Sequence, residues 1–363
     1  MFVAWRELRF ARGRFVLIGA VVALITLLVG FLSGLTGGLA AQNISAVLQL
    51  PGSHLVLQQP ENGSPSFATS SLDQQTVSDW EQAAGVDDVS AIGIAQSRAL
   101  AGASGDPTGV ALFGLPKGSA SDQDNSLLAL TPTQSDEIGL SAGAAKELDV
   151  TVGDTVTIIG QEFTVSAIGE DLWYSHTPVI AMSFDAWSES SIRIGGSGEA
   201  TVLAVTGTPD WNAVSEATDT SAKSTLASLT ALEAFKSEIG SLGLMIGMLF
   251  GISALVIGAF FTVWTMQRAG DIAVLKALGS TTGSLVRDSL GQALVVLVLG
   301  ITVGLGAVLG LGALAGQALP FVVSPLTTLA PAIVMALLGL AGAAFALRSV
   351  TKADPLTALG SNR

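Results

Sequence analysis

The sequence predicts an α-helical membrane protein with four transmembrane helices and a mixed α/β extracellular domain inserted between the first and the second helix. Two features of the composition support this fold class. Of the 363 residues, 49% are hydrophobic and only 12% are charged, about half the charged fraction of an ordinary soluble domain. Four uncharged stretches reach the roughly 20 apolar residues that a helix needs to cross a bilayer: residues 15–39, 242–266, 290–319 and 322–347.

The first span follows a basic segment, residues 1–14, in which Arg residues alternate with Trp, Leu and Phe. This pattern is typical of an amphipathic helix at the inner membrane surface, and equally of a simple basic flank that sets topology. The apolar run of the span, about 25 residues, exceeds the roughly 7–15 residues of a signal-peptide core. We therefore expect the span to be retained.

Residues 41–240 have the composition of a soluble domain and are numerous enough to bury a core of their own. Alternating Val, Thr and Ile residues over 150–168, interrupted at Gly153-Asp154 and Gly160-Gln161, predict two or three strands joined by tight turns. The other elements expected in this domain are a helix over 71–85, strands over 179–184 and 200–206, and an amphipathic helix over 221–239 that runs into the second span.

The charges are distributed asymmetrically. Residues 41–240 hold 25 acidic and 6 basic residues, whereas the rest of the chain holds 4 acidic and 10 basic ones. These ten flank the spans on one side: Arg6, Arg9, Arg12, Arg14, Arg268, Lys276, Arg287, Arg348, Lys352 and Arg363. By the positive-inside rule both termini are cytoplasmic and the acidic domain is outside. With a net charge of −13, no nucleic-acid partner is expected.

We therefore expect a multi-pass protein of the cell membrane, with the lipid bilayer around its helices. Its predicted parts are a cytoplasmic amphipathic N-terminus (1–14), transmembrane helix 1 (15–40), the extracellular domain (41–240), transmembrane helix 2 (241–267), a cytoplasmic coupling helix (268–288), transmembrane helix 3 (289–319), an extracellular turn with transmembrane helix 4 (320–347) and a cytoplasmic tail (348–363).

The sequence contains no motif for a site that would supply the energy for transport. It has no G-x-x-x-x-G-K-[ST] phosphate loop, so the chain is not its own P-loop ATPase. The spans lack the Asp, Glu, Lys or Arg residues that mark proton or sodium pathways. The outer domain has no nucleophile–base–acid grouping, and the chain has no cysteine for a thiolate metal site. We expect no catalytic residue, no structural metal ion and no intrinsic cofactor, with ATP bound by a separate subunit.

Three segments resemble the MacB/FtsX-like permeases, which are membrane subunits of ATP-driven transporters. Between the second and third spans, Arg268 and the run Asp271-Ile-Ala-Val-Leu-Lys-Ala-Leu-Gly279 resemble the coupling helix R-x-x-[ED]-I-x-[VL]-[LK]-[AK]-[LI]-G. The run from Asp354 to Leu359 is similar to the D-P-x-x-A-[LI] tail, and residues 148–169 are similar to the G-D-x-V turn and F-x-V-x-x-I-G strand of the outer domain. Together they imply a permease that docks on an ABC ATPase.

The segment 268–279 by itself allows two interpretations. A helix there places apolar side chains on one side, as a helix that binds a partner's groove does, but this is also the pattern of an ordinary amphipathic helix at a membrane edge. The resemblance favours coupling to the ATPase. The residues that it assigns to coupling are Arg268, Asp271, Ile272, Leu275, Lys276, Leu278 and Gly279.

Within this family the haem-efflux permeases show the greatest resemblance. The end of the first span, from Ser33 through Asn43-Ile44-Ser45, resembles S-G-L-x-x-G-L-x-x-x-N-I-S in that branch. Tyr174-Ser175-His176 and the following apolar pair resemble Y-x-H-x-x-[VI]-[VI], and the junction from Phe235 to Met245 is also similar. The resemblance implies haem as the substrate, bound at the outer leaflet between the first and second spans.

Haem chemistry narrows the candidate residues. Haem needs an apolar slot, an axial ligand such as His, Met or Tyr, and partners for its propionates. The candidates are Glu238, Tyr174, His176, Phe235, Met245, Met248, Asn43 and His54, among which Glu238, Tyr174, His176 or Met245 would bind the iron. For each of them the ordinary alternative is a packed or solvated side chain, and for the methionines it is membrane packing.

Two other functions fit the same sequence: export of another amphipathic substrate, such as a lipid, peptide or antibiotic, and FtsX-like transmission of ATPase strokes to an outer partner without transport.

Four spans enclose little space, and small residues recur at a spacing of four in the first two spans, at Gly30, Gly34 and Gly38 and at Gly243, Gly247 and Gly251. Such spacing lets helices approach closely. Together with the resemblance, it predicts a homodimer packed through these spans.

Overall fold

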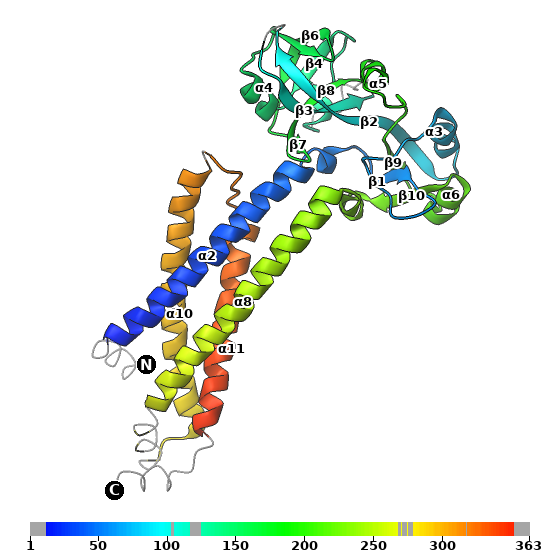
Figure 1. The fold of residues 1–363 in the computed structure, drawn as a ribbon. Helices are drawn as coiled ribbons and strands as arrows, with labels where there is room; N and C mark the ends of the chain where they lie inside the picture. Colours follow the sequence, from blue (N-terminus) through cyan, green and yellow to red (C-terminus); the bar gives the residue numbers. More distant parts are fainter. Residues whose placement is uncertain are drawn as a thin grey trace. The chain divides into compact units, whose positions relative to one another are not determined.

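The computed structural model describes residues 12–351 apart from 103–104, 117–124, 268–269, 271–273, 275–278 and 317. The chain divides into two compact units, one made of Met1–Gly38 with Gly240–Arg363 and the other of Leu39–Ile239. The described part of the first unit is built from long helices, and the second unit contains the strands (Figure 1). A helical unit and a mixed α/β unit are the two parts that the composition predicts.

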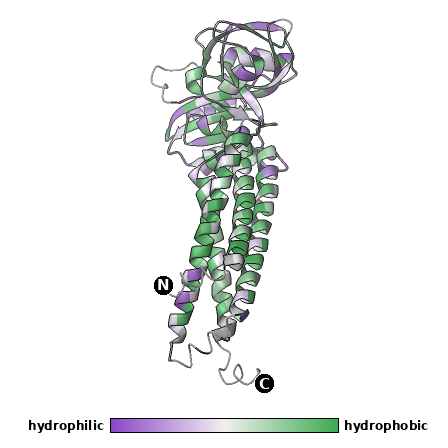
Figure 2. Ribbon diagram, turned by 90° about the vertical axis from the view of Figure 1, so that its left-hand side faces the viewer, coloured by the Kyte–Doolittle hydropathy of each residue, from purple (hydrophilic) through white to green (hydrophobic). Residues whose placement is uncertain are grey.

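Four long helices carry the apolar sequence: α2 (Arg12–Ile44), α8 (Glu233–Gln267), α10 (Thr282–Ala315) and α11 (Pro325–Thr351). Each contains a stretch long and apolar enough to cross a membrane, and Figure 2 shows apolar residues along their length. Helices satisfy their own backbone hydrogen bonds, which lipid cannot do. The predicted fold class is confirmed.

Glycines of α10 let this helix contact α2 closely. A Cβ atom added at Gly300 would lie 2.8 Å from Val22 Cβ, and one added at Gly304 would lie 2.6 Å from Thr26 Cβ. Real Cβ atoms do not approach so closely, so neither position has room for a side chain. Gly300 and Gly304 therefore serve packing within the chain.

The segment that precedes α11 packs against the same helix pair. The ring of Phe321 contacts both Gly34 of α2 and Gly312 of α10, and its centroid lies 5.0 Å from that of Phe31. Val322 donates its N–H to the Gly34 carbonyl at 3.1 Å. A Cβ atom at Gly38 would overlap the Pro320 carbonyl, so this contact requires glycine.

Six strands of the Leu39–Ile239 unit form a closed barrel. Their order is β2 (Val86–Ala101), β3 (Thr108–Leu115), β8 (Thr177–Ser183), β4 (Glu137–Leu140), β6 (Gln161–Ile168) and β5 (Thr155–Ile158), and β5 pairs back onto β2 at Ala99–Ala101. The β3–β8 and β4–β6 pairs are parallel and the others antiparallel. Buried residues of these strands form one core with α4 (Ala142–Leu148) and α5 (Phe184–Arg193).

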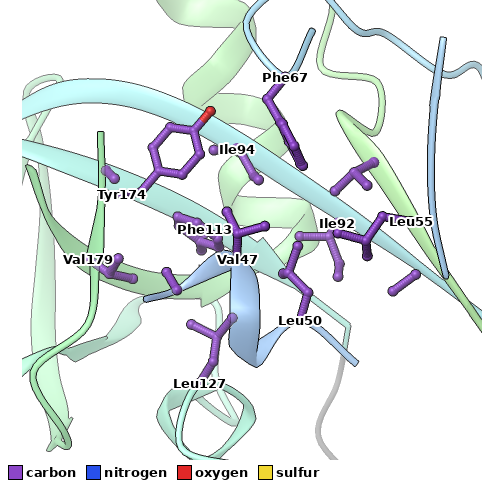
Figure 3. Packing of buried hydrophobic residues seen from close by; sticks show 14 of the residues in the cluster. Val47, Leu50, Leu55, Phe67, Ile92, Ile94, Phe113, Leu127, Tyr174 and Val179 are labelled. Carbon is purple, nitrogen blue, oxygen red and sulfur yellow. The ribbon is translucent and has the colours of Figure 1, made fainter. Parts of the chain in front are cut away.

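The N-terminal half of β2 belongs to a second, open sheet. It pairs with β9 (Val202–Gly207), which is followed by β1 (His54–Gln58) and β10 (Thr220–Ser224). One face of this sheet packs against α3 (Gln74–Glu81) and α6 (Trp211–Ala217), and Trp80 of α3 is buried in the core between them. A further core joins both sheets to the short helices η1 (Val47–Gln49), η3 (Leu128–Leu130) and η4 (Leu229–Ala231) (Figure 3).

The local predictions have mixed outcomes. The strands expected within 150–168, 179–184 and 200–206 are confirmed as β5, β6, β8 and β9. The helix expected over 71–85 is shorter and covers only Gln74–Glu81. It begins there because the Asp73 side chain caps it by accepting a hydrogen bond from the Thr76 N–H, and Leu72 instead forms a β-bridge with Ala200.

The helix expected over 221–239 is wrong in its first part and confirmed from Glu233 onward, where α8 begins and continues into the second span. Thr220–Ser224 is strand β10, followed by α7 (Thr225–Ser228) and η4 before α8 begins at Glu233. Thr220–Ser224 pairs antiparallel with His54–Gln58 along its whole length, and such long-range pairing outweighs the local helical pattern.

We expect Gly38→Ala to lower the unfolding temperature of the purified chain in detergent, because the added methyl group must displace the Pro320 carbonyl. Overpacking of this kind typically reduces the free energy of unfolding by about 1–3 kcal/mol. Gly306→Ala is the matched control, because nothing lies within 4 Å of the Cβ position there. Equal thermal shifts for the two variants would contradict the close contact at Gly38.

Candidate functional site

The C-terminal end of α2 is capped by a turn that lies far away in the sequence. The carbonyl of Gln42 accepts a hydrogen bond from the His176 N–H at 3.0 Å, and that of Asn43 accepts one from the Ser175 N–H at 3.1 Å. Carbonyl groups in the last turn of a helix have no partner within the helix. Residues 39–44 of α2 and this turn all belong to the Leu39–Ile239 unit.

The turn has an unusual backbone. Ser175 and His176 are the two residues between β7 (Trp173–Tyr174) and β8, and their φ angles are 46° and 64°. Positive φ at both positions is the pattern of a type I′ turn, which prefers Asn-Gly; a residue with a Cβ pays roughly 1–2 kcal/mol for it. Ser45 and Ala46 hold the turn through hydrogen bonds of 2.8 Å to Trp173 N and 3.0 Å to Trp173 O.

This geometry brings three predicted site residues together: Asn43 from the end of α2, His176 from the turn and Glu238 from the start of α8. We call them the trio. Asn43 Nδ2 donates to Glu238 Oε2 at 3.0 Å, His176 Nε2 lies 3.2 Å from the same oxygen, and Asn43 Nδ2 lies 3.3 Å from His176 Nε2. The Asn43 side chain is fully buried, whereas those of His176 and Glu238 are 38% and 20% exposed.

Tyr174 is two residues before His176 in sequence but points into the core. It is 6% exposed and its ring meets those of Phe67 and Phe113 edge-on (Figure 3). The residue also lines a cavity of about 460 Å³ together with Gln96 and Glu233. Burial raises the pKa of the Tyr174 hydroxyl far above its usual range, because apolar surroundings disfavour the phenolate. A neutral phenol is a poor iron ligand compared with a phenolate.

None of the other predicted haem residues makes a hydrogen bond to the trio within the described part of the chain, and each has its own surroundings. Phe235 packs against the same core as Tyr174. His54 stacks on Trp211 with ring centroids 3.8 Å apart, and burial lowers the pKa of its imidazole. Met245 and Met248 belong to the helical unit, where both side chains are more than half exposed.

Most residues predicted to couple to an ATPase lie outside the described part of the chain: Arg268, Asp271, Ile272, Leu275, Lys276 and Leu278. Gly279 is described and has a φ of 95°, a left-handed value that favours glycine. Two residues later, Thr281 caps α10 by accepting a hydrogen bond from the Ser284 N–H at 3.3 Å.

Sequence reasoning did not find the residues that position the trio. Ser45 and Trp173 hold the turn. In the sequence, Ser45 only ends the N-I-S motif without an assigned role, and Trp173 looks like an ordinary strand residue. The turn itself contains no glycine or asparagine, which are the usual signals of a type I′ turn. Within the described ranges no group of three His, Cys, Asp or Glu side chains could hold a metal ion.

Comparison with known proteins gives two family matches. Residues 16–221 match the MacB-like periplasmic core domain, and residues 243–355 match the FtsX-like permease C-terminal domain. The first match alone covers more than half of the chain.

The relatives that match over the whole length include two staphylococcal proteins. HrtB of Staphylococcus haemolyticus (strain JCSC1435), provisionally described as a hemin transport system permease protein, is 28% identical over 99% of both chains. HrtB of Staphylococcus epidermidis (strain ATCC 12228 / FDA PCI 1200), with the same description, is 25% identical over 100% of both.

Among solved structures, the periplasmic region of MacB from Actinobacillus actinomycetemcomitans aligns with 52% of this chain and 94% of its own, at 12% identity. The TM-score of this alignment is 0.34. The assignment follows from the family matches, whose order along the chain agrees with four apolar helices and an inserted α/β unit. The chain belongs to the MacB/FtsX-like permeases, as a multi-pass membrane subunit of the ABC transporter type.

Proposed function

We propose that this permease exports haem, that it works as a homodimer, and that a separate ABC ATPase subunit binds the ATP. The observation that carries the haem assignment is the trio: His176 and Glu238, far apart in the sequence, have side-chain atoms 3.2 Å apart. The description of the full-length relatives as hemin transport permeases adds support. Both termini lie in the cytoplasm in this proposal, in accordance with the positive-inside rule.

The trio offers suitable chemistry for haem iron. Imidazole nitrogen is a common axial ligand, and His176 is the more exposed of the two potential iron ligands in the trio. Asn43 fixes the orientation of the Glu238 carboxylate from a fully buried position. Tyr174 is a weaker candidate because its phenol stays protonated, and Met245 remains a candidate that only an experiment can test.

The homodimer is supported by α8. Nothing lies within 4 Å of the Cβ positions of Gly243, Gly247 and Gly251, and only 17% of the most apolar stretch of α8 is buried, against 28–33% in the other three helices. Gly30, Gly34, Gly37 and Gly38 of α2, in contrast, already pack within the chain. In this proposal the dimer therefore forms mainly through α8, whose small residues allow close helix contact.

In the full-length chain in lipid nanodiscs, we expect His176→Asn and Glu238→Gln each to weaken haem binding at least about tenfold, which corresponds to ~1.4 kcal/mol. Asn tolerates the left-handed conformation at residue 176, so the first variant keeps the turn. The measurement is a haem titration followed by the absorption band, with His54→Asn as control. Unchanged binding in both variants would remove the trio as the haem site.

The phenotype of a deletion strain distinguishes haem export from the two alternative functions. Deletion of the gene should make cells sensitive to haem. Sensitivity to a lipid, peptide or antibiotic instead would favour another exported substrate, and a division or wall-lysis defect without haem sensitivity would favour a transmitter without transport.

We expect Leu275→Asp to abolish co-purification with the ABC ATPase that accompanies the wild-type chain, because a charge then replaces an apolar contact in the partner's groove. Ala277→Ser is the control and should leave the complex intact. If no ATPase accompanies the wild-type chain, or if both variants retain it, the assignment of this segment to coupling fails.

We expect Gly247→Leu to shift the chain from dimer to monomer in native mass spectrometry from detergent, because a leucine side chain keeps the two α8 helices apart. Gly306→Leu on α10 is the matched control, since its Cβ position is equally open. Loss of the dimer with Gly306→Leu but not with Gly247→Leu would place the interface on α10 instead.

A further inference from the structure

The N-terminal end of α8 is open to a cavity in the α/β unit. Lys236 donates its N–H to the Leu232 carbonyl at 2.9 Å. The N–H groups of Glu233, Ala234 and Phe235, the first three residues of the helix, have no hydrogen-bond partner among the residues that the structure describes. The preceding leucine has no side-chain oxygen with which to cap the helix. Glu233 and Ala234 both line the cavity of about 460 Å³, so unpaired backbone donors at the positive end of a long helix border it.

Tyr174 supplies a second, independent observation. Its side chain is 6% exposed and lines the same cavity. Its hydroxyl has no hydrogen-bond partner within the described ranges, since the bond from the Thr177 hydroxyl ends on the Tyr174 backbone carbonyl. Figure 3 shows the hydroxyl on the side of the ring where Ile94 and Phe67 lie, and both of these residues line the cavity.

The Tyr174 hydroxyl is a donor in search of an acceptor. Burial raises the pKa of this group far above its usual range, so it keeps its proton and can donate it. A buried donor without a partner is unfavourable, and a ligand in the cavity can supply the missing acceptor. Ser66, which is 7% exposed, adds a further donor: its Oγ accepts a hydrogen bond from the Ala68 N–H at 3.2 Å, but its own O–H has no acceptor among the described residues.

Glu233 does not indicate a cationic ligand. Among the described residues that line the cavity it alone carries a charge, and an acidic residue in the first turn is what the positive end of a helix favours. Its side chain is exposed, so water screens its effect on a ligand. The donors that it leaves unpaired outnumber this one acidic group.

The remaining lining residues are mostly apolar, among them Phe67, Ile94 and Leu232. The volume lies within the roughly 300–1,000 Å³ of small-molecule sites. We propose that this cavity binds a carboxylate carried on an apolar body, as in a medium-chain fatty acid. The carboxylate accepts hydrogen bonds from the first N–H groups of α8 and from the Tyr174 hydroxyl, and the apolar part lies against the three apolar side chains.

The proposal does not rest on haem transport, although the two sites share the β7–β8 turn. Ser175 of this turn lines the cavity, and His176 belongs to the trio. Haem itself carries propionate carboxylates, so a porphyrin and a free fatty acid are two sources of the same chemical group. The experiment distinguishes them.

The test uses octanoate and the full-length chain in lipid nanodiscs, with octanamide as the matched neutral probe. The chain has a single tyrosine, so ¹³Cζ-tyrosine labelling of this chain reports Tyr174 alone in solid-state NMR. We expect octanoate to shift this signal saturably, with one site per chain. Octanamide should bind at least about tenfold more weakly, because hydrogen bonds to a charged group are stronger than those to a neutral one. An unmoved Tyr174 signal, or equal binding of the two probes, would overturn the proposal.

Two variants should change octanoate affinity in opposite directions, measured by calorimetry against empty nanodiscs. Tyr174→Phe keeps the ring in the core and removes only the hydroxyl, so binding should weaken at least about tenfold. Glu233→Gln removes a like charge near the carboxylate and should tighten binding about two- to fivefold. Ser90→Ala, in the same strand β2 but away from the lining residues, is the control and should bind as the wild type does. Unchanged affinity in Tyr174→Phe, or weaker binding in Glu233→Gln as a cationic ligand would give, contradicts the carboxylate site.

Haem titrated into the octanoate-loaded chain identifies the source of the carboxylate. Displacement of octanoate indicates a haem propionate, whereas haem that binds alongside octanoate indicates a separate apolar carboxylate; the cavity is a carboxylate site in both outcomes. Octanoate binding with no haem binding would overturn only the haem assignment.

Discussion

The last carbonyl groups of α2 have no partner within their own helix, and the contact that satisfies them organises the candidate site. The β7–β8 turn donates its two N–H groups to Gln42 and Asn43, which requires left-handed backbone at two residues that carry side chains. That conformation costs energy and persists because Ser45, Ala46 and the strand pairs on either side hold the turn. Its consequence is that His176 lies beside Asn43 and Glu238.

The barrel gives this turn a rigid support. Strand β8 follows the turn directly and pairs with β3 on one side and β4 on the other. These pairs within the closed barrel hold the backbone next to His176 in place. Tyr174, one residue before the turn, packs in the core that both sheets share. Tyr174 and His176, two positions apart, therefore have opposite surroundings, one apolar and buried, the other polar and partly exposed.

Glycine has two different roles in the long helices. In α2 and α10 it allows close packing within the chain, at Gly34 and Gly38 against the segment before α11 and at Gly300 and Gly304 against α2. On α8 the glycines at 243, 247 and 251 contact nothing. Because lipid is as apolar as the side chains, burial alone gives little drive for helix association, and close contact is what favours it. The open glycines of α8 are therefore the ones that the proposed homodimer would use.

The sequence by itself determined the four apolar helices, the inserted α/β unit, its strands over 150–168 and the family, because length, hydropathy and alternation are local properties. It also singled out Asn43, His176 and Glu238 as candidates. Only the tertiary structure decided that these three meet while Tyr174 packs in the core and His54 stacks on Trp211. It also decided that Thr220–Ser224 is a strand and that Gly34 and Gly38 of α2 pack within the chain. Each of these depends on contacts between residues tens to hundreds of positions apart, and the energy of such contacts can exceed the local preferences that a sequence pattern records.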